Sequence, residues 1–119
     1  MSNTNQRVGK HGEWVAAEHL VDSGIRLVER NWRCQLGEID IIAWDGDTLV
    51  FCEVKTRRGA GYGTPAEAVV RAKQERLRRL ALAYLSATGI HPAELRFDVV
   101  SVLPQRRSLP RVEHIKGAF

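Results

Sequence analysis

Two strand-like segments joined by a tight turn constrain the fold of this 119-residue chain more than any other feature. Glu38–Trp44 and Thr48–Arg57 are rich in β-branched and aromatic residues, and the Asp-Gly-Asp sequence of Asp45–Asp47 between them is typical of a hairpin turn. Ile25–Trp32, immediately before them, is expected to be another strand. Together the segments predict an antiparallel meander.

Helical patterns flank this meander. Residues 1–7 are polar and aperiodic and predict a loose tail, whereas Val8–Ser23 has a helical period and is followed by Gly24, the residue type that caps helix C-termini. Thr64–Glu67 combines an N-cap threonine, a proline at the first helical position and a glutamate three residues after the cap. A second helix is therefore expected from there towards Ser86.

Two further strands are expected after the second helix, at Leu95–Leu103 and, as a short edge strand, at Arg111–Ile115. The first of them can lie parallel to an earlier strand through a right-handed crossover. This order of elements predicts an α/β fold with a mixed central sheet flanked by helices. The length fits a single domain over residues 1–119.

Composition excludes several classes of protein. No apolar run approaches the ~18 residues that a membrane helix needs, and the polar N-terminus lacks a signal-peptide core, so a cytoplasmic protein without a membrane partner is expected. Cys34 and Cys52 are too few for a disulfide framework or a four-cysteine zinc site. Lysine and arginine number 18 against 14 acidic residues, and the net charge of +4 allows a polyanionic partner.

Acidic residues stand inside the two hairpin strands among apolar neighbours. Pairing of the strands would bring Asp40 and Glu53 to neighbouring positions on one surface, with Lys55 pointing into the same site. Close carboxylates repel each other, and a hard divalent cation such as Mg²⁺ or Mn²⁺ would remove that cost. The lysine could stabilise developing negative charge or orient an attacking water. The alternative is a solvated strand face, which the apolar neighbours disfavour.

A further carboxylate, Glu13, has an unusual place in the first helix. At ~100° per residue, it falls near the middle of an apolar stripe made of Trp14, Ala16, Ala17, Leu20 and Val21. A helix that packs on the sheet through this stripe would carry Glu13 towards the carboxylates of the strands.

The motifs Gly37–Asp40 (GEID), Phe51–Arg57 (FCEVKTR) and Gly63–Val69 (GTPAEAV) together resemble the bacterial YraN-like family of small proteins. The resemblance runs from about Gly12 to Val102. It relates the chain to Holliday junction resolvases within the restriction-endonuclease-like PD-(D/E)xK nuclease superfamily. The resemblance therefore implies a restriction-endonuclease-like core for the expected α/β fold.

The resemblance also implies roles for individual residues. It puts the metal-binding aspartate of the superfamily at Asp40, the (D/E)xK pair at Glu53 and Lys55, and the acidic residue of the first helix at Glu13. The backbone carbonyl of Val54 would be a further metal ligand. These residues would form the catalytic site, with Mg²⁺ or Mn²⁺ as the cofactor.

Other polar residues near these motifs have two interpretations each. Glu38 either supports a metal ligand through a hydrogen bond or is solvated at the start of its strand. Gln74 either reaches a metal-bound water or a phosphate, or lies on the surface of the second helix. Ile39 stands where the name of the superfamily would put a proline, as is usual in resolvase-like members. Asp98 is expected to have a structural hydrogen-bonding role, and Glu18 is expected to be solvated.

Basic residues near the motifs are candidates for binding nucleic acid. Arg57 and Arg58 lie at the end of the strand that carries Glu53 and Lys55, and Arg33 precedes the hairpin. Lys73 lies on the second helix, where a solvated helix charge is the alternative. Contacts between such residues and phosphates position DNA without reading its sequence. The chain has no segment that resembles a recognition helix.

Two functions remain open from the sequence. The first is a metal-dependent endonuclease that hydrolyses DNA phosphodiester bonds and selects structure rather than sequence; the resemblance to resolvases implies branched DNA and a homodimer. The alternative is a non-catalytic module that binds nucleic acid or a partner on the nuclease fold. The alternative leaves the electrostatic cost of the carboxylate cluster uncompensated, so the sequence favours the nuclease.

Overall fold

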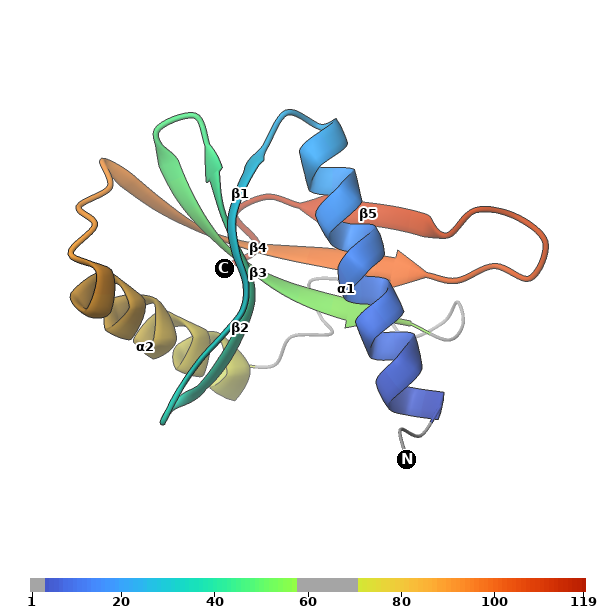
Figure 1. Cartoon of the computed structure of the whole chain (residues 1–119), viewed down its shortest axis with the longest axis horizontal. Helices are drawn as coiled ribbons and strands as arrows, with labels where there is room; N and C mark the ends of the chain where they lie inside the picture. Colours follow the sequence, from blue (N-terminus) through green and yellow to red (C-terminus); the bar gives the residue numbers. More distant parts are fainter. Residues whose placement is uncertain (1–3, 58–70) are drawn as a thin grey trace.

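The computed structural model describes residues 4–57 and 71–119, with side chains from Lys10 onward (Figure 1). The predicted helix start at Thr64–Glu67, the Gly63–Val69 motif and the candidate DNA-binding residue Arg58 lie outside the described residues. Among the described residues, no helix is long and apolar enough to cross a membrane.

The strands form one mixed sheet in the order β1-β2-β3-β4-β5. The meander is made of β1 (Arg26–Cys34), β2 (Gly37–Asp45) and β3 (Thr48–Thr56), which pair antiparallel in chain order. β4 (Glu94–Leu103) runs parallel to β3, and β5 (Arg111–Ile115) pairs antiparallel with β4 at the sheet edge. The predicted α/β fold with a mixed sheet is confirmed, and it is consistent with a restriction-endonuclease-like core.

One helix covers each face of the sheet (Figure 1). α1 (Thr4–Asp22) packs on the face that carries Val50 and Cys52 of β3, and α2 (Arg71–Thr88) packs on the face that carries the alternate residues Leu49 and Phe51. Each face therefore has its own buried apolar cluster, and the strands between the clusters are covered on both sides. This burial on both faces explains why β2 and β3 are nearly continuous apolar runs.

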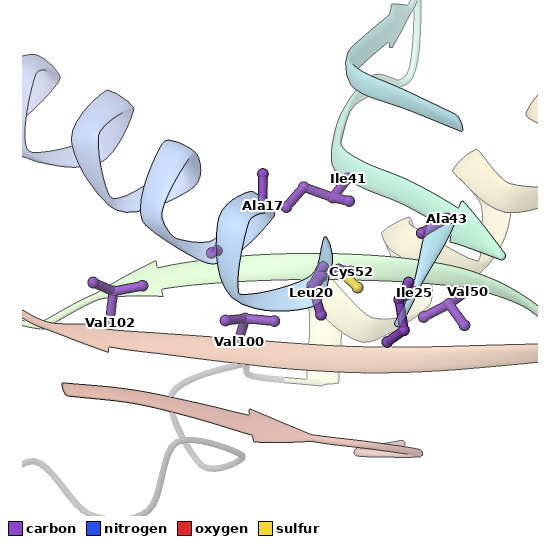
Figure 2. Packing of buried hydrophobic residues seen from close by; sticks show 10 residues of the cluster. Ala17, Leu20, Ile25, Ile41, Ala43, Val50, Cys52, Val100 and Val102 are labelled. Carbon is purple, nitrogen blue, oxygen red and sulfur yellow. The ribbon is translucent and has the colours of Figure 1, made fainter. Parts of the chain in front are cut away.

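The packing of α1 is centred on Leu20, which lies close to Cys52 and Val100 in the buried cluster (Figure 2). The helix ends as predicted at Gly24, whose φ of +89° suits a residue without a Cβ. Here the amide of Gly24 bonds the carbonyl of Val21 at 3.0 Å, and the amide of Ile25 bonds the carbonyl of Leu20 at 3.0 Å. This pair of bonds is a Schellman cap, and it turns the chain into β1.

Two predictions about α1 need correction. The helix begins at Thr4, so residues 4–7 are helical and the predicted loose tail over residues 1–7 is wrong there. The predicted apolar stripe is also wrong at its edge, because Trp14 is 49% exposed and Val21 is 52% exposed. Ala16, Ala17 and Leu20 face the sheet, whereas Trp14 and Val21 point beyond its edge next to β1.

Asp98 has the structural role predicted for it. Its side chain is fully buried in β4 and accepts hydrogen bonds from Arg96 at 2.9 and 3.0 Å and from the amide of Gly117 at 2.9 Å. The Nε2 atom of His114 lies 2.7 Å from the same carboxylate. These bonds hold the pKa of Asp98 below its usual value although burial opposes them. They also fasten β5 and the chain after it to the sheet.

Candidate metal centre

A gap in the pairing of β2 and β3 positions the first candidate residue. The ladder between these strands runs from Asp45 and Thr48 to Ile41 and Cys52, and Asp40 lies just beyond it. The backbone amide of Val54 donates a 2.8 Å hydrogen bond to Oδ2 of Asp40. A side-chain carboxylate thus replaces the next ladder bond, which fixes this side chain between the two strands.

The surroundings of Asp40 oppose its ionisation. Burial and, after it, the nearby carboxylates of Glu53, Glu13 and Glu38 together raise the pKa of Asp40 to about 8, against the opposing effect of the bond from Val54. A divalent cation would reverse this balance, because it favours the charged form of each carboxylate around it. The site is therefore built at an electrostatic cost that a bound cation would remove.

Glu53 and Lys55 point to the same side of β3, towards α2. Oε1 of Glu53 lies 3.8 Å from Nζ of Lys55 and 3.1 Å from Nζ of Lys73, a residue of α2. Partial burial and the neighbouring Lys73 lower the pKa of Lys55. Lys55 therefore loses its proton more easily than a solvated lysine does. The pKa of Lys73 is raised, against its partial burial, by its contacts with Lys55 and Glu53.

Glu13 and Glu38 also bring their carboxylates close to that of Asp40. One carboxylate oxygen of each of these residues lies within 4.8 Å of the others. Glu13 reaches the group from α1, which approaches β3 closely at Gly12, where a Cβ would meet Oγ1 of Thr56 at 1.9 Å. The structure thus brings Glu13 of α1 together with Glu38 and Asp40 of β2, whereas Glu53 of β3 shares a pocket with Asp40 but does not belong to this group.

Asn31 is the residue that the sequence interpretation missed. Its Nδ2 donates hydrogen bonds of 2.9 Å to Glu13 and 3.3 Å to Glu38, so one amide holds two carboxylates of the group. Its φ of +53° lies in the left-handed region, which asparagine tolerates better than most residues. An asparagine inside a strand pattern is a weak sequence signal, and only the fold shows what it contacts.

A pocket of about 250 Å³ opens between the sheet and α2 beside these groups. Its walls combine carboxylates from the strands with cations from the helix, and they include Glu38, Asp40, Glu53, Lys73 and Arg76. The pocket is large enough to admit a small charged group, such as a phosphate, between the acidic and the basic walls. Carboxylate oxygens in this number and spacing suit a hard divalent cation such as Mg²⁺ or Mn²⁺.

The other predicted residues that the structure describes do not line this pocket. Arg33 is largely exposed and forms an ion pair with Glu38. Arg57 follows β3 directly and is half-buried, and its backbone amide bonds the carbonyl of Val102 at 2.8 Å. Gln74 is half-buried on α2, next to Lys73. Glu18 is exposed, as predicted.

The residues of the candidate centre lie within the part of the chain that matches a known protein family. The family model for the uncharacterised protein family UPF0102 matches residues 12–102. The chain belongs to this family. The match agrees with the YraN-like resemblance of the sequence motifs, and its residues run from Gly12, next to Glu13, past Lys55 and α2.

Curated UPF0102 proteins are similar to the chain over almost its whole length. A UPF0102 protein of Parafrankia sp. (strain EAN1pec) is 56% identical over 115 residues, which cover 97% of this chain and 98% of the relative. A UPF0102 protein of Symbiobacterium thermophilum is 55% identical with the same coverage. One of Rhodococcus jostii (strain RHA1) is 50% identical, again with 97% and 98% of the two chains covered.

Proposed function

We propose that this UPF0102 protein is a metal-dependent endonuclease that hydrolyses DNA phosphodiester bonds and selects DNA by structure rather than by sequence. The observation that carries the proposal is the position of Asp40. Its carboxylate lies near those of Glu13, Glu38 and Glu53, and burial together with these charges raises its pKa to about 8. Such a cluster carries an electrostatic cost that a bound cation would offset.

The residues divide into ligands and charge stabilisers. Glu13, Asp40 and Glu53, with the carbonyl of Val54 and with Glu38 beside them, would hold Mg²⁺ or Mn²⁺. A cation bound there would polarise a phosphoryl oxygen and lower the pKa of a bound water. Lys55, whose own pKa is lowered by burial and by Lys73, is placed to orient the attacking water or to stabilise negative charge on the phosphate.

Glu53 has two lysine neighbours, and this arrangement fits a phosphate ligand. Lys73 binds the carboxylate at 3.1 Å and lies in the wall of the pocket with Arg76. A phosphodiester that enters the pocket would meet the carboxylates on one side and these cations on the other. Arg33, Arg57 and Arg58 are proposed to contact phosphates further along the DNA, which adds affinity without sequence preference.

The resemblance to resolvases is the reason for proposing branched DNA and a homodimer. A symmetric dimer would carry two such centres and could cut two strands of a junction. Sedimentation of the purified chain, alone and with a four-way junction, measures this directly. A chain that stays monomeric in both samples would contradict the dimer but not the nuclease.

The test of the nuclease is cleavage of end-labelled junction, flap, single-stranded and duplex DNA in Mg²⁺, in Mn²⁺ and in EDTA. Wild type is compared with Asp40→Ala, with Lys55→Ala and with the exposed-site control Lys10→Ala, all purified identically. The proposal expects products only with metal, from wild type and the control. If wild type binds DNA but cleaves none of the four DNA forms, and Asp40→Ala binds DNA equally well, the nuclease proposal is contradicted. The function would then be that of the non-catalytic binding module.

A further inference from the structure

A second hollow lies along one flank of α1, between this helix and the edge strand β1. Its volume is about 380 Å³. Trp14 and Val21 of α1 and Leu27 of β1 give it an apolar lining, and Arg30, Glu18 and Asp22 add charged groups. We call it the Trp14 groove.

Trp14 stands apart from the other two tryptophans of the chain. Its side chain is 49% exposed, whereas Trp32 and Trp44 are partly buried against the core on the α2 face. His11, one turn earlier on α1, stacks on the indole with ring centroids 6.1 Å apart and an interplanar angle of 26°. An exposed indole of this kind is a surface on which a flat aromatic ligand can stack.

The groove and the candidate metal centre use neighbouring residues of the same two elements, α1 and β1. Trp14 directly follows Glu13 in α1, and Arg30 directly precedes Asn31 in β1. Asn31 donates a 2.9 Å hydrogen bond to Glu13. The lining of the groove therefore includes the residue after Glu13 and the residue before Asn31, which itself holds Glu13.

From this placement we propose that the Trp14 groove binds one unpaired nucleobase of the DNA whose phosphodiester lies at the candidate metal centre. The inference rests on the proposed nuclease function and names its substrate class, namely DNA with an unpaired nucleotide beside the scissile bond. A base inside a duplex is stacked on both faces and paired along its Watson–Crick edge, so it cannot enter a groove of this size.

The mixed chemistry of the groove favours a base over a phosphate. Trp14, Val21 and Leu27 suit the faces of an aromatic ring, while Arg30 can donate to the carbonyl oxygens and ring nitrogens of a base. Glu18 and Asp22 can accept from exocyclic amino groups. The same two carboxylates would repel a phosphate, so the lining favours a base over the sugar–phosphate backbone.

The experiment measures tryptophan fluorescence during titration with a single-stranded oligonucleotide in Mg²⁺. All proteins carry Lys55→Met, so that no cleavage interferes. The proposal expects quenching in this parent and in a Trp44→Phe control, but not in Trp14→Phe, because only Trp14 contacts the base. Trp14→Ala should bind the oligonucleotide roughly 5- to 150-fold more weakly, the range for loss of one base stack.

An oligonucleotide of the same length without bases is the matched ligand control. Equal quenching by this oligonucleotide, or unchanged quenching in Trp14→Phe, would overturn the proposal. It would also be overturned if Trp14→Ala abolished self-association while leaving DNA affinity unchanged, since the groove would then be a surface for a second copy. The nuclease proposal fails separately, through the absence of cleavage by wild type, so the two failures are distinguishable.

Discussion

The backbone amide of Val54 bonds Oδ2 of Asp40 at 2.8 Å, at the point where the ladder between β2 and β3 ends. This bond places a carboxylate where a carbonyl oxygen would stand in a regular sheet. Beyond it β2 and β3 are no longer paired, and the carboxylates of Glu13 from α1 and Glu38 from β2 lie close to that of Asp40 there. The candidate centre is therefore a consequence of how the hairpin ends, and not of a separate loop.

The stability of the metal-free protein should depend on the ionisation of Asp40. Its pKa in the unfolded chain is 3.8, and in the folded chain it is raised to about 8. The stability contributed by the protonated group is complete below the unfolded pKa and is lost as the pH rises through the folded one. Asp40→Asn cannot ionise, yet its side-chain oxygen can still accept from Val54.

In EDTA, the melting temperature of Asp40→Asn should therefore rise relative to wild type as the pH increases from 4 to above 8. A gain of at least about 4 °C is expected at the alkaline end, the shift that ~1 kcal/mol causes in a small domain. Thermal melts followed by circular dichroism measure it. A difference between the two proteins that is the same at every pH would contradict the raised pKa.

Asn31 should act on the metal through the residues that it positions. Asn31→Ala removes the amide that bonds both Glu13 and Glu38, and loss of such support typically lowers metal affinity about 10- to 100-fold. Mn²⁺ titration followed by electron paramagnetic resonance is the measurement. Arg33→Ala is the matched control, because Arg33 also contacts Glu38 but is largely exposed. Equal affinities for Asn31→Ala and wild type would show that the bonds do not position the ligands.

Lys55 should affect cleavage without affecting metal binding. Its ammonium lies 3.8 Å from Oε1 of Glu53, where it can stabilise charge that develops on the phosphate. Lys55→Ala is expected to lower the single-turnover cleavage rate by about 10²- to 10³-fold, as loss of one charge-stabilising donor does in other enzymes. Its Mn²⁺ affinity should stay close to that of wild type. A parallel loss of both quantities would instead make Lys55 a structural part of the cluster.

The ion-pair network of Asp98 should contribute to stability and not to catalysis. Asp98→Ala leaves Arg96 and His114 without their buried partner, and breaking a buried pair in this way costs about 3–5 kcal/mol. Urea unfolding measures the loss, with Asp47→Ala in the exposed turn as the control. The folded fraction of Asp98→Ala should cleave DNA at the rate of wild type, and a selective loss of cleavage would link this network to the candidate centre.

Local patterns predicted the elements of this fold well, because hairpin turns and caps depend on few neighbouring residues. The Asp-Gly-Asp turn, the cap at Gly24 and the strand from Arg111 to Ile115 lie where the sequence indicated. The alternation of strand residues also placed Glu53 and Lys55 on one side of β3. These features need no knowledge of how distant elements pack.

The contacts between elements could not be predicted in the same way. The pairing of Lys73 with Glu53 depends on where α2 docks, and the role of Asn31 depends on a left-handed residue inside β1. The exposure of Trp14 follows from where the sheet ends beneath α1. Helical periodicity indicates which side of a helix is apolar, but it does not indicate how much of that side the sheet is wide enough to cover.

Mn²⁺ binding and DNA cleavage, measured on the same samples of wild type and Asp40→Asn, test the central claim most directly. The titration is made at pH 8.5, where Asp40 of the wild type is largely ionised, and cleavage of the junction and flap substrates is followed in parallel. The account predicts saturable Mn²⁺ binding and cleavage by wild type, and loss of both in a folded Asp40→Asn. Equal Mn²⁺ binding by the two proteins, or cleavage that survives in Asp40→Asn, would contradict it.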